Sequence, residues 1–252
     1  MNRASWFTFR QVASVGVFVA SVIALSSSSI ASVQFELDFT DGKLPSQTGQ
    51  GLNFTGSTGL LETDIFSVSG DKLILDTTSS PANAYGGYQI SPDGFDSSID
   101  VLLEFRARTL EVAGGSFGMF FGFRDASAYG AIQVTETGWR LVDTATSGTF
   151  SDPSAFHDFQ LKKPGGSNGY ELRIDGVLVA SGVLLPGSGP SYVYFGDGSP
   201  TGGNQRGEID YIRYSNAPFA NSAVPEPSSI VTAFGCILAF AGFYRFSKRR
   251  SL

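Results

Sequence analysis

The chain has 252 residues, of which 42% are hydrophobic and 16% charged, and this composition is typical of a folded protein with one sizeable core rather than of a disordered chain. Its single cysteine and single histidine exclude a zinc finger, a disulfide framework and a Cys-His catalytic dyad. The formal net charge is −6, and the charges are distributed unevenly along the chain.

Residues 1–31 have the order of a secretory signal peptide. Two arginines precede an apolar run from Val12 to Leu25, and a tract of small residues ends in Ala31. This order predicts passage through the Sec translocon and cleavage by signal peptidase between Ala31 and Ser32. The alternative is an uncleaved membrane anchor, but the apolar run is shorter than the roughly 20 residues that a spanning helix needs.

Residues 224–252 combine three features in order. A Val-Pro-Glu-Pro motif precedes an uncharged apolar segment at 228–244, and a basic cluster follows that segment. The motif and the cluster consist of Val224, Pro225, Glu226, Pro227, Arg245, Lys248, Arg249 and Arg250. An apolar segment followed by basic residues predicts a transmembrane helix whose tail stays in the cytoplasm. Residues 216–223 are expected to form a short linker in front of the motif.

These features resemble the PEP-CTERM sorting signal of Gram-negative bacteria that make extracellular polysaccharide. The resemblance implies that an exosortase, a membrane-embedded cysteine protease or transpeptidase, removes the tail near the Pro-Glu-Pro motif. It implies an exported protein that is anchored in the inner membrane by its C-terminus and then, once processed, reaches the cell surface or extracellular matrix. The alternative is an ordinary single-pass anchor behind a proline-rich linker.

The region between the two ends is strongly acidic. Six of the 17 basic residues lie in the ends, which leaves 11 basic and 22 acidic residues and a net charge of about −11 between them. Such a surface repels nucleic acid and anionic lipid, so neither is expected as a partner of this region.

Alternation of apolar and polar residues predicts that residues 32–215 form one all-β domain. Residues 33–39 and 101–107 alternate strictly, as strands with one buried face do. Asp175-Gly176 lies between two further runs and predicts a hairpin with a two-residue turn. Other strands are expected at 72–76, 85–90, 117–123, 131–135, 139–142, 156–162, 192–195 and 208–214. About a dozen short strands with glycine-rich turns predict a two-sheet β-sandwich or jelly roll.

The order of these features resembles that of concanavalin A-like, laminin-G-like domains. The resemblance rests on four segments: 39–42 (Phe-Thr-Asp-Gly), 156–159 (Phe-His-Asp-Phe), 172–176 (Leu-Arg-Ile-Asp-Gly) and 209–213 (Ile-Asp-Tyr-Ile-Arg). It spans most of residues 33–215 and implies a curved sandwich whose last strand pairs back toward the first.

Glu36, Asp38 and Asp41 are candidate catalytic acids. Their spacing resembles the Glu-x-Asp-x-x-Glu motif of laminarinase-type glucanases, in which two carboxylates act as nucleophile and acid. Here the third acid is an aspartate in an Asp-Gly turn, and the apolar residues between the acids need the core face. We therefore predict no catalytic residues in this motif. His157, on a strand beside Phe156, is likewise expected to be structural.

Two binding hypotheses remain. Asp197, Asn204 and Glu208 supply oxygen ligands in or near a flexible loop, so they are candidate calcium ligands, although no cofactor is required. Tyr88, Trp139 and Tyr192 are candidate ligand platforms, because sugars stack their apolar faces on aromatic rings.

Other tyrosines and two glycines extend the second hypothesis. Tyr85, Tyr129 and Tyr194 occupy strands or loop edges, and they are candidates to line a concave sheet. Gly118 and Gly122, opposite a stripe of apolar side chains, predict close approach of another backbone or of a ligand.

The sequence thus predicts a non-catalytic surface or matrix protein that binds exopolysaccharide. One alternative is a polysaccharide hydrolase or lyase on the same fold. Another is a structural matrix protein without a small ligand.

Overall fold

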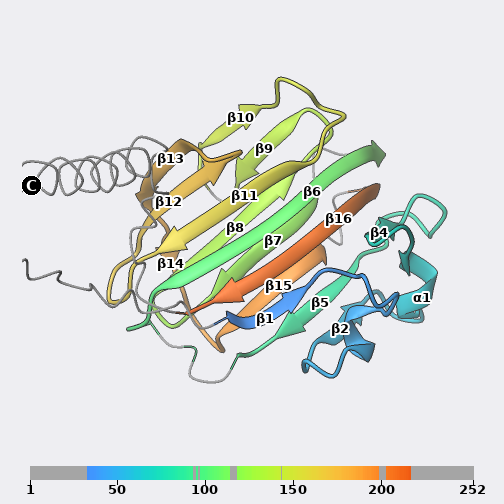
Figure 1. The fold of residues 1–252 in the computed structure, drawn as a ribbon, viewed down its shortest axis with the longest axis horizontal. Helices are drawn as coiled ribbons and strands as arrows, with labels where there is room; N and C mark the ends of the chain where they lie inside the picture. Colours follow the sequence, from blue (N-terminus) through green and yellow to red (C-terminus); the bar gives the residue numbers. More distant parts are fainter. Residues whose placement is uncertain are drawn as a thin grey trace, which may run out of the picture.

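The computed structural model describes residues 33–92, 95, 97–113, 118–142, 144–198 and 203–216. Within these residues two antiparallel sheets of eight strands each pack into a sandwich (Figure 1). The predicted all-β, two-sheet architecture is confirmed. The predicted signal peptide, the sorting signal at 224–252 and all of the linker except Asn216 lie outside the described residues. No helix in the described part of the chain is long and apolar enough to cross a membrane.

The first sheet, sheet A, contains the longest strands. Its path runs β13 (Val177–Val183), β12 (Gly169–Ile174), β11 (His157–Lys163), β6 (Val101–Ala113), β16 (Asn204–Ser215), β4 (Leu73–Asp76) and β3 (Phe66–Val68), and β1 (Val33–Leu37) also pairs with β16. Sheet B runs β10 (Ser147–Thr149), β9 (Gly138–Leu141), β8 (Ala128–Val134), β7 (Met119–Arg124), β15 (Tyr192–Asp197), β5 (Gly86–Ile90) and β2 (Asn53–Gly56), and β14 (Leu185–Pro186) pairs with β8.

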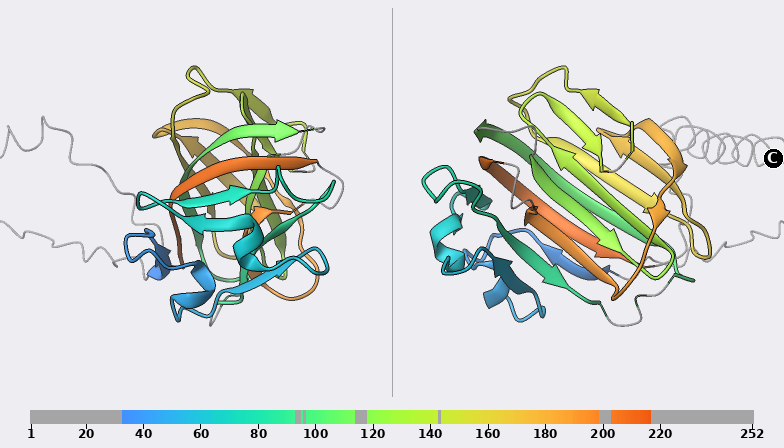
Figure 2. Two further views of the ribbon diagram at one scale, coloured as in Figure 1. Left: turned by 90° about the vertical axis from the view of Figure 1, so that its right-hand side faces the viewer. Right: turned by 180° about the vertical axis from the view of Figure 1, so that it is seen from behind.

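The helical content of the described residues is small. A 3₁₀ turn at Pro45–Gln47 and the four-residue helix α1 (Glu62–Ile65) lie in the connections around β2. Figure 2 shows that α1 and β2 lie at the end of the sandwich opposite to β9 and β10.

The core follows from alternation on the central strands. On β6, Val101, Leu103, Phe105 and Ala107 have no exposed surface, and their polar neighbours face outward. Phe105 of sheet A stacks on Phe121 of sheet B, with ring centroids 3.8 Å apart, so the two sheets interdigitate at the centre. Burying such a side chain stabilises the fold by about 1.5–3 kcal/mol.

The structure confirms the predicted hairpin at Asp175-Gly176 and the predicted pairing of the last strand with the first. Asp175 and Gly176 have φ values of 51° and 78°, which a two-residue hairpin turn between β12 and β13 requires. β1 pairs with the end of β16, where Val33 lies opposite Ser215. The first and last described strands therefore meet, as the sequence predicts.

Candidate functional site

The outer face of sheet B carries a hollow of about 390 Å³, which we call the groove. Strands β2, β5, β7, β8 and β15 contribute most of its lining. The lining residues are Thr55, Tyr85, Gln89, Phe120, Gly122, Arg124, Tyr129, Ala131, Tyr192, Tyr194 and Gly198. Five are aromatic, and none of these described residues carries a carboxylate.

The floor of the groove is made by two small residues. Gly122 of β7 lies opposite Ala131 of β8 in the antiparallel register. A Cβ atom on Gly122 would lie 2.7 Å from the Cβ of Ala131 and equally close to the Gly130 carbonyl oxygen, so this position fits only glycine. The prediction that Gly122 marks a close approach is confirmed. Gly118, just before β7, does the same, because a Cβ there would lie 1.8 Å from the Val134 carbonyl oxygen.

One wall of the groove is a row of three side chains on neighbouring strands. The register places Tyr192 of β15 beside Arg124 of β7, and Arg124 beside Tyr129 of β8. The Arg124 guanidinium carbon lies 4.5 Å from the centroid of the Tyr192 ring. Its Nε–H donates a hydrogen bond of 3.1 Å to the Pro190 carbonyl oxygen. The stacking and the hydrogen bond together hold both side chains in place.

Tyr194 forms the other side of the groove. Its hydroxyl donates a 2.7 Å hydrogen bond to the carbonyl oxygen of Asp197, which fixes the ring over Gly87. Burial, together with the charge of Asp197, raises the pKa of Tyr194 above its ordinary value. The side chain is therefore a neutral phenol at physiological pH.

The lining suits a neutral, hydroxylated ligand with apolar faces. Aromatic rings offer flat apolar surfaces, while phenol, amide and hydroxyl groups exchange hydrogen bonds with a ligand. A few polar groups on a mainly apolar surface are typical of small-molecule sites. A carbohydrate has this combination of an apolar ring face and a polar rim.

Tyr192 lies in the groove, but Tyr88 and Trp139 do not, and for these two the prediction was wrong. Tyr88 has no exposed surface and packs between the sheets, with ring centroids 4.7 Å from Phe66 and 5.2 Å from Phe195. Trp139 is 7% exposed and belongs to the core. On a strand, a shift of one residue changes the face, and on β5 it is Gln89, not Tyr88, that lines the groove.

Three tyrosines were candidates to line a concave sheet. All three line the groove, namely Tyr85, Tyr129 and Tyr194. Phe120 and Arg124 also line the groove and were not predicted. The buried stripe of Met119, Phe121 and Phe123 puts residues 120, 122 and 124 on the opposite face, and that alternation was the available signal.

The acidic motif begins on β1 and continues past its end, and its three acids line a small hollow of about 90 Å³ that is separate from the groove. Phe35, Leu37 and Phe39 are buried, so Glu36 and Asp38 are exposed on the outer side of β1, as predicted. Asp41 is also exposed and pairs with Lys43 at 3.1 Å. Hydrogen bonds from the backbone and side chain of Lys43 lower the pKa of Asp41.

The three candidate calcium ligands do not converge, and this prediction is corrected. Glu208 faces outward on sheet A, where it pairs with Arg108 at 2.8 Å. The buried side chain of Asn204 donates to the carbonyl oxygens of Ser80 and Pro81, and Asp197 is buried near Thr77. Four residues of extended strand put Asn204 about 13 Å from Glu208. The described residues contain no group of three His, Cys, Asp or Glu side chains placed to hold a metal ion.

His157 is the first residue of β11, and its contacts are structural. One ring nitrogen lies 2.7 Å from the Asp175 carboxylate and the other 3.0 Å from the Asp152 carbonyl oxygen. The ring stacks on Phe150 at 4.1 Å between centroids. These contacts tie the β12–β13 turn to the preceding loop, which agrees with the predicted structural role.

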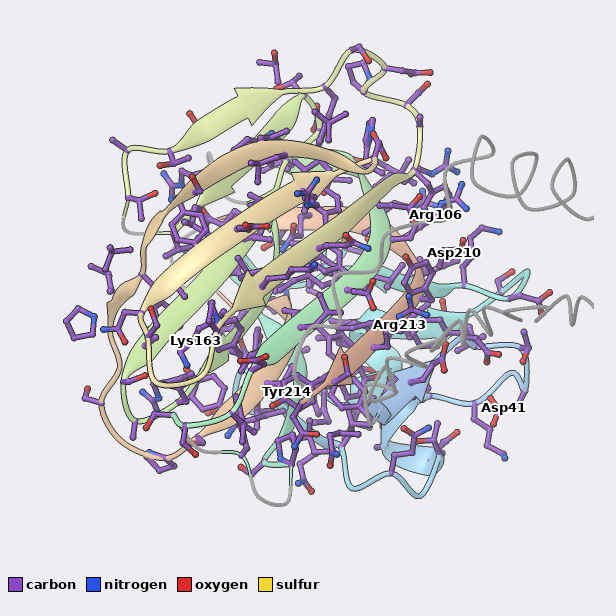
Figure 3. All side chains as sticks on the ribbon, turned by 60° about the vertical axis from the view of Figure 1, so that its left-hand side comes forward. Asp41, Arg106, Lys163, Asp210, Arg213 and Tyr214 are labelled. Carbon is purple, nitrogen blue, oxygen red and sulfur yellow. The ribbon has the colours of Figure 1, made fainter. Side chains whose placement is uncertain are left out.

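The outer face of sheet A differs from the groove because ion pairs cover it. Arg213 binds Glu104 at 2.6 Å, and Arg106 lies 3.5 Å from Asp210. Figure 3 shows Arg106 and Asp210 side by side on this face. Each of these charges is compensated locally, whereas tyrosines line the groove on sheet B.

No protein-family model matches the chain, and no curated protein matches it. Solved structures match it by fold. The carbohydrate recognition domain of Emp47p has a TM-score of 0.51 and 15% identity, over 77% of this chain and 100% of that chain. The carbohydrate esterase vb_24B_21 from Shiga toxin-encoding bacteriophage phi24B has a TM-score of 0.52 and 13% identity, over 75% and 100%. Peanut lectin has a TM-score of 0.50 and 9% identity, over 75% and 98%. The chain therefore has a concanavalin A-like, lectin-like β-sandwich fold.

Proposed function

We propose that the groove on sheet B binds a glycan and does not cleave it. The observation that carries this proposal is a hollow lined by five aromatic side chains in which no described residue bears a carboxylate. The groove is also preorganised, because Tyr192 is stacked under Arg124 and Tyr194 is hydrogen-bonded to the backbone. A preorganised site loses little conformational entropy when it binds.

Glycoside hydrolysis of the usual kind needs two carboxyl groups about 5–10 Å apart on either side of the scissile bond. Glu36, Asp38 and Asp41 line a separate hollow of about 90 Å³ beside β1, and none of them lines the groove, so they do not flank a glycan bound there. The fold itself does not decide between binding and catalysis, because its structural neighbours include both a carbohydrate recognition domain and a carbohydrate esterase. The support comes from the chemistry of the lining.

Affinity electrophoresis in gels that contain laminarin, xylan, alginate or polygalacturonate tests the proposal. We expect at least one polysaccharide to retard the wild type, and Tyr192→Ala and Tyr129→Ala each to weaken that binding about 10-fold or more. Tyr211→Ala is the matched control, because Tyr211 is a half-buried tyrosine on sheet A whose hydroxyl donates to Asp158. Binding in EDTA should equal binding in calcium.

Two outcomes would overturn the proposal. Release of reducing ends or unsaturated sugars by the wild type, but not by groove variants, would favour the hydrolase or lyase. If no polysaccharide retards the wild type or any variant, a structural matrix protein without a small ligand would be favoured.

We further propose that the protein is exported and then sorted by an exosortase-like enzyme. The support is the sequence order of signal peptide, Val-Pro-Glu-Pro motif, apolar segment and basic cluster. The intact mass of the protein from its host should correspond to a chain without about 31 N-terminal residues and without a C-terminal tail beginning near the Pro-Glu-Pro motif. Deletion of the exosortase should restore the tail. A tail that persists in the wild-type host would indicate a plain single-pass anchor instead.

A further inference from the structure

Arg124 forms no ion pair with any described residue, whereas five other arginines do. Five others pair with a carboxylate, namely Arg106 with Asp210, Arg108 with Glu208, Arg173 with Glu171, Arg206 with Asp76 and Arg213 with Glu104. Arg140 donates to Gln133. Among the described residues, Arg124 forms no ion pair, and its hydrogen bond to Pro190 uses only the Nε–H.

The position of this unpaired charge is also unusual. Arg124 lines the groove, and no described lining residue neutralises it. The region between the signal peptide and the tail carries about two acidic residues for each basic one, so a positive charge without an acidic partner is not a consequence of composition.

The orientation of the Arg124 guanidinium is fixed in a way that suits a planar anion. Stacking on Tyr192 at 4.5 Å and the Nε–H bond to Pro190 fix its plane, while the Nη1 and Nη2 amino groups keep their donors free of described partners. A guanidinium fork of this kind binds a carboxylate with two parallel hydrogen bonds. Because the fork is already oriented, little side-chain entropy is lost when an anion arrives.

We propose that the groove recognises an acidic glycan, with Arg124 binding the carboxylate of a uronic acid while the tyrosines contact the sugar rings. This inference rests on the proposed function and adds the class of ligand to it. Arg124 is then the residue that makes the groove bind acidic glycans more tightly than neutral ones.

The test compares oligogalacturonates and alginate oligosaccharides with the same oligosaccharides after chemical reduction of their carboxyl groups. Titration calorimetry at low salt measures the wild type, Arg124→Gln, Arg124→Lys and Tyr192→Ala. Arg206→Gln is the matched control, because Arg206 is an exposed arginine on sheet A that pairs with Asp76. Thermal unfolding of every variant reports whether it is folded.

We expect the wild type to bind at least one acidic oligosaccharide about 10-fold or more tightly than its reduced form. Arg124→Gln should bring the ratio of the two affinities to about one, and Arg124→Lys should restore only part of the preference, because lysine lacks the fork. Tyr192→Ala should weaken both ligands, and Arg206→Gln neither.

The inference and the proposed function fail in different ways. Equal binding of acidic and reduced oligosaccharides, unaffected by Arg124→Gln but lost in Tyr192→Ala, would overturn the acidic class and keep a neutral glycan site. Absence of binding to either form, in a folded wild type, together with no retardation by laminarin or xylan, would overturn both.

Discussion

Lys163 and Asp125 form a buried ion pair that joins the two sheets. Lys163 ends β11 of sheet A, Asp125 follows β7 of sheet B, and neither side chain has exposed surface. Their charged atoms lie 3.0 Å apart. Asp125 also accepts hydrogen bonds from the backbone N–H groups of Ser127 and Ala128. Oδ1 of Asp125 thus accepts backbone hydrogen bonds while Oδ2 faces the Lys163 ammonium, and a charge inside a sandwich requires such a counter-ion.

Replacement of Lys163 by methionine should destabilise the protein by about 3–5 kcal/mol, because it leaves the Asp125 carboxylate buried without its counter-ion. Urea unfolding followed by tryptophan fluorescence measures this loss. Arg206→Gln removes an exposed pair and should change the free energy of unfolding by no more than about 1 kcal/mol. Similar small losses in both variants would contradict the importance of burial.

The same pair predicts how stability depends on pH. Burial raises the pKa of Asp125, but its contact with Lys163 and the hydrogen bonds from Ser127 and Ala128 outweigh burial and lower the pKa overall. A carboxylate whose folded pKa lies below the unfolded value of about 3.9 stabilises the fold above that value, and this contribution is lost as pH falls through the folded pKa. The free energy of unfolding should therefore decline below about pH 4.

The double variant Lys163→Met with Asp125→Leu provides the control for this dependence. It removes both charges, so its free energy of unfolding should fall less steeply between pH 5 and pH 2.5 than that of the wild type, by an amount expected from one shifted carboxylate. Parallel profiles for the two proteins would show that other carboxylates carry the acid sensitivity.

At the scale of the elements, Gly87 leaves room for Tyr194 where β5 pairs with β15. A Cβ atom on Gly87 would lie 2.4 Å from the Tyr194 hydroxyl oxygen and 2.5 Å from the Phe195 carbonyl oxygen. The second contact is with backbone, so a side chain at this position must move a strand. The groove thus depends on a glycine that is not itself among its lining residues.

Substitution of Gly87 by alanine should cost about 1–3 kcal/mol and weaken glycan binding, because it displaces Tyr194 and its strand. Urea unfolding and affinity electrophoresis measure the two effects. Gly169→Ala on β12 is the control, since a Cβ there would lie 3.2 Å from the Ser167 hydroxyl and 3.8 Å from the Gly182 carbonyl oxygen, which leaves the backbone in place. Full glycan binding by a folded Gly87→Ala variant would show that Tyr194 does not have to lie over this glycine.

The elements that sequence reasoning located are those with a complete alternating pattern. β6 and β7 alternate buried and outward residues, and this pattern predicts them directly. The strands β2, β3, β10 and β14 were not predicted. Each has two to four residues, and each gains its place from pairing with a neighbour rather than from its own pattern. Short edge strands of this kind carry too few residues to show a period.

At the scale of the whole molecule, β1 joins the first described residues to the last strand of sheet A. It pairs with β16 beside the point where β4 pairs with the same strand, and it contributes Phe35 and Leu37, each 3% exposed, to the core. Both ends of the described chain therefore leave from one corner of the sandwich (Figure 1).

A protein that spans residues 32–216 should unfold cooperatively and bind glycan like the full chain. A protein that spans residues 38–216 loses two buried side chains and a strand, and it should be less stable by about 3–6 kcal/mol or fail to fold. Urea unfolding of both proteins measures the difference. Equal stability of the two would show that β1 is an accessory strand.

The sequence by itself determined the fold class and the positions that face the core. Alternating side chains on the long strands and the Asp-Gly turn act through local geometry, so they can be read from neighbouring residues. The placement of the acids of β1 on an exposed face followed in the same way, since Phe35 and Leu37 next to them needed burial.

The tertiary structure alone decided which aromatic residues form the groove and which charge stands unpaired in it. Tyr192 is far from Arg124 along the chain and becomes its neighbour only through the pairing of β15 with β7, whereas Arg124 and Tyr129 face each other across the β7–β8 hairpin. Tyr88 looked equally suited to a ligand, but the register of β5 turns it into the core. Sequence patterns show which side of a strand a residue takes, whereas strand order and register decide which residues share that side.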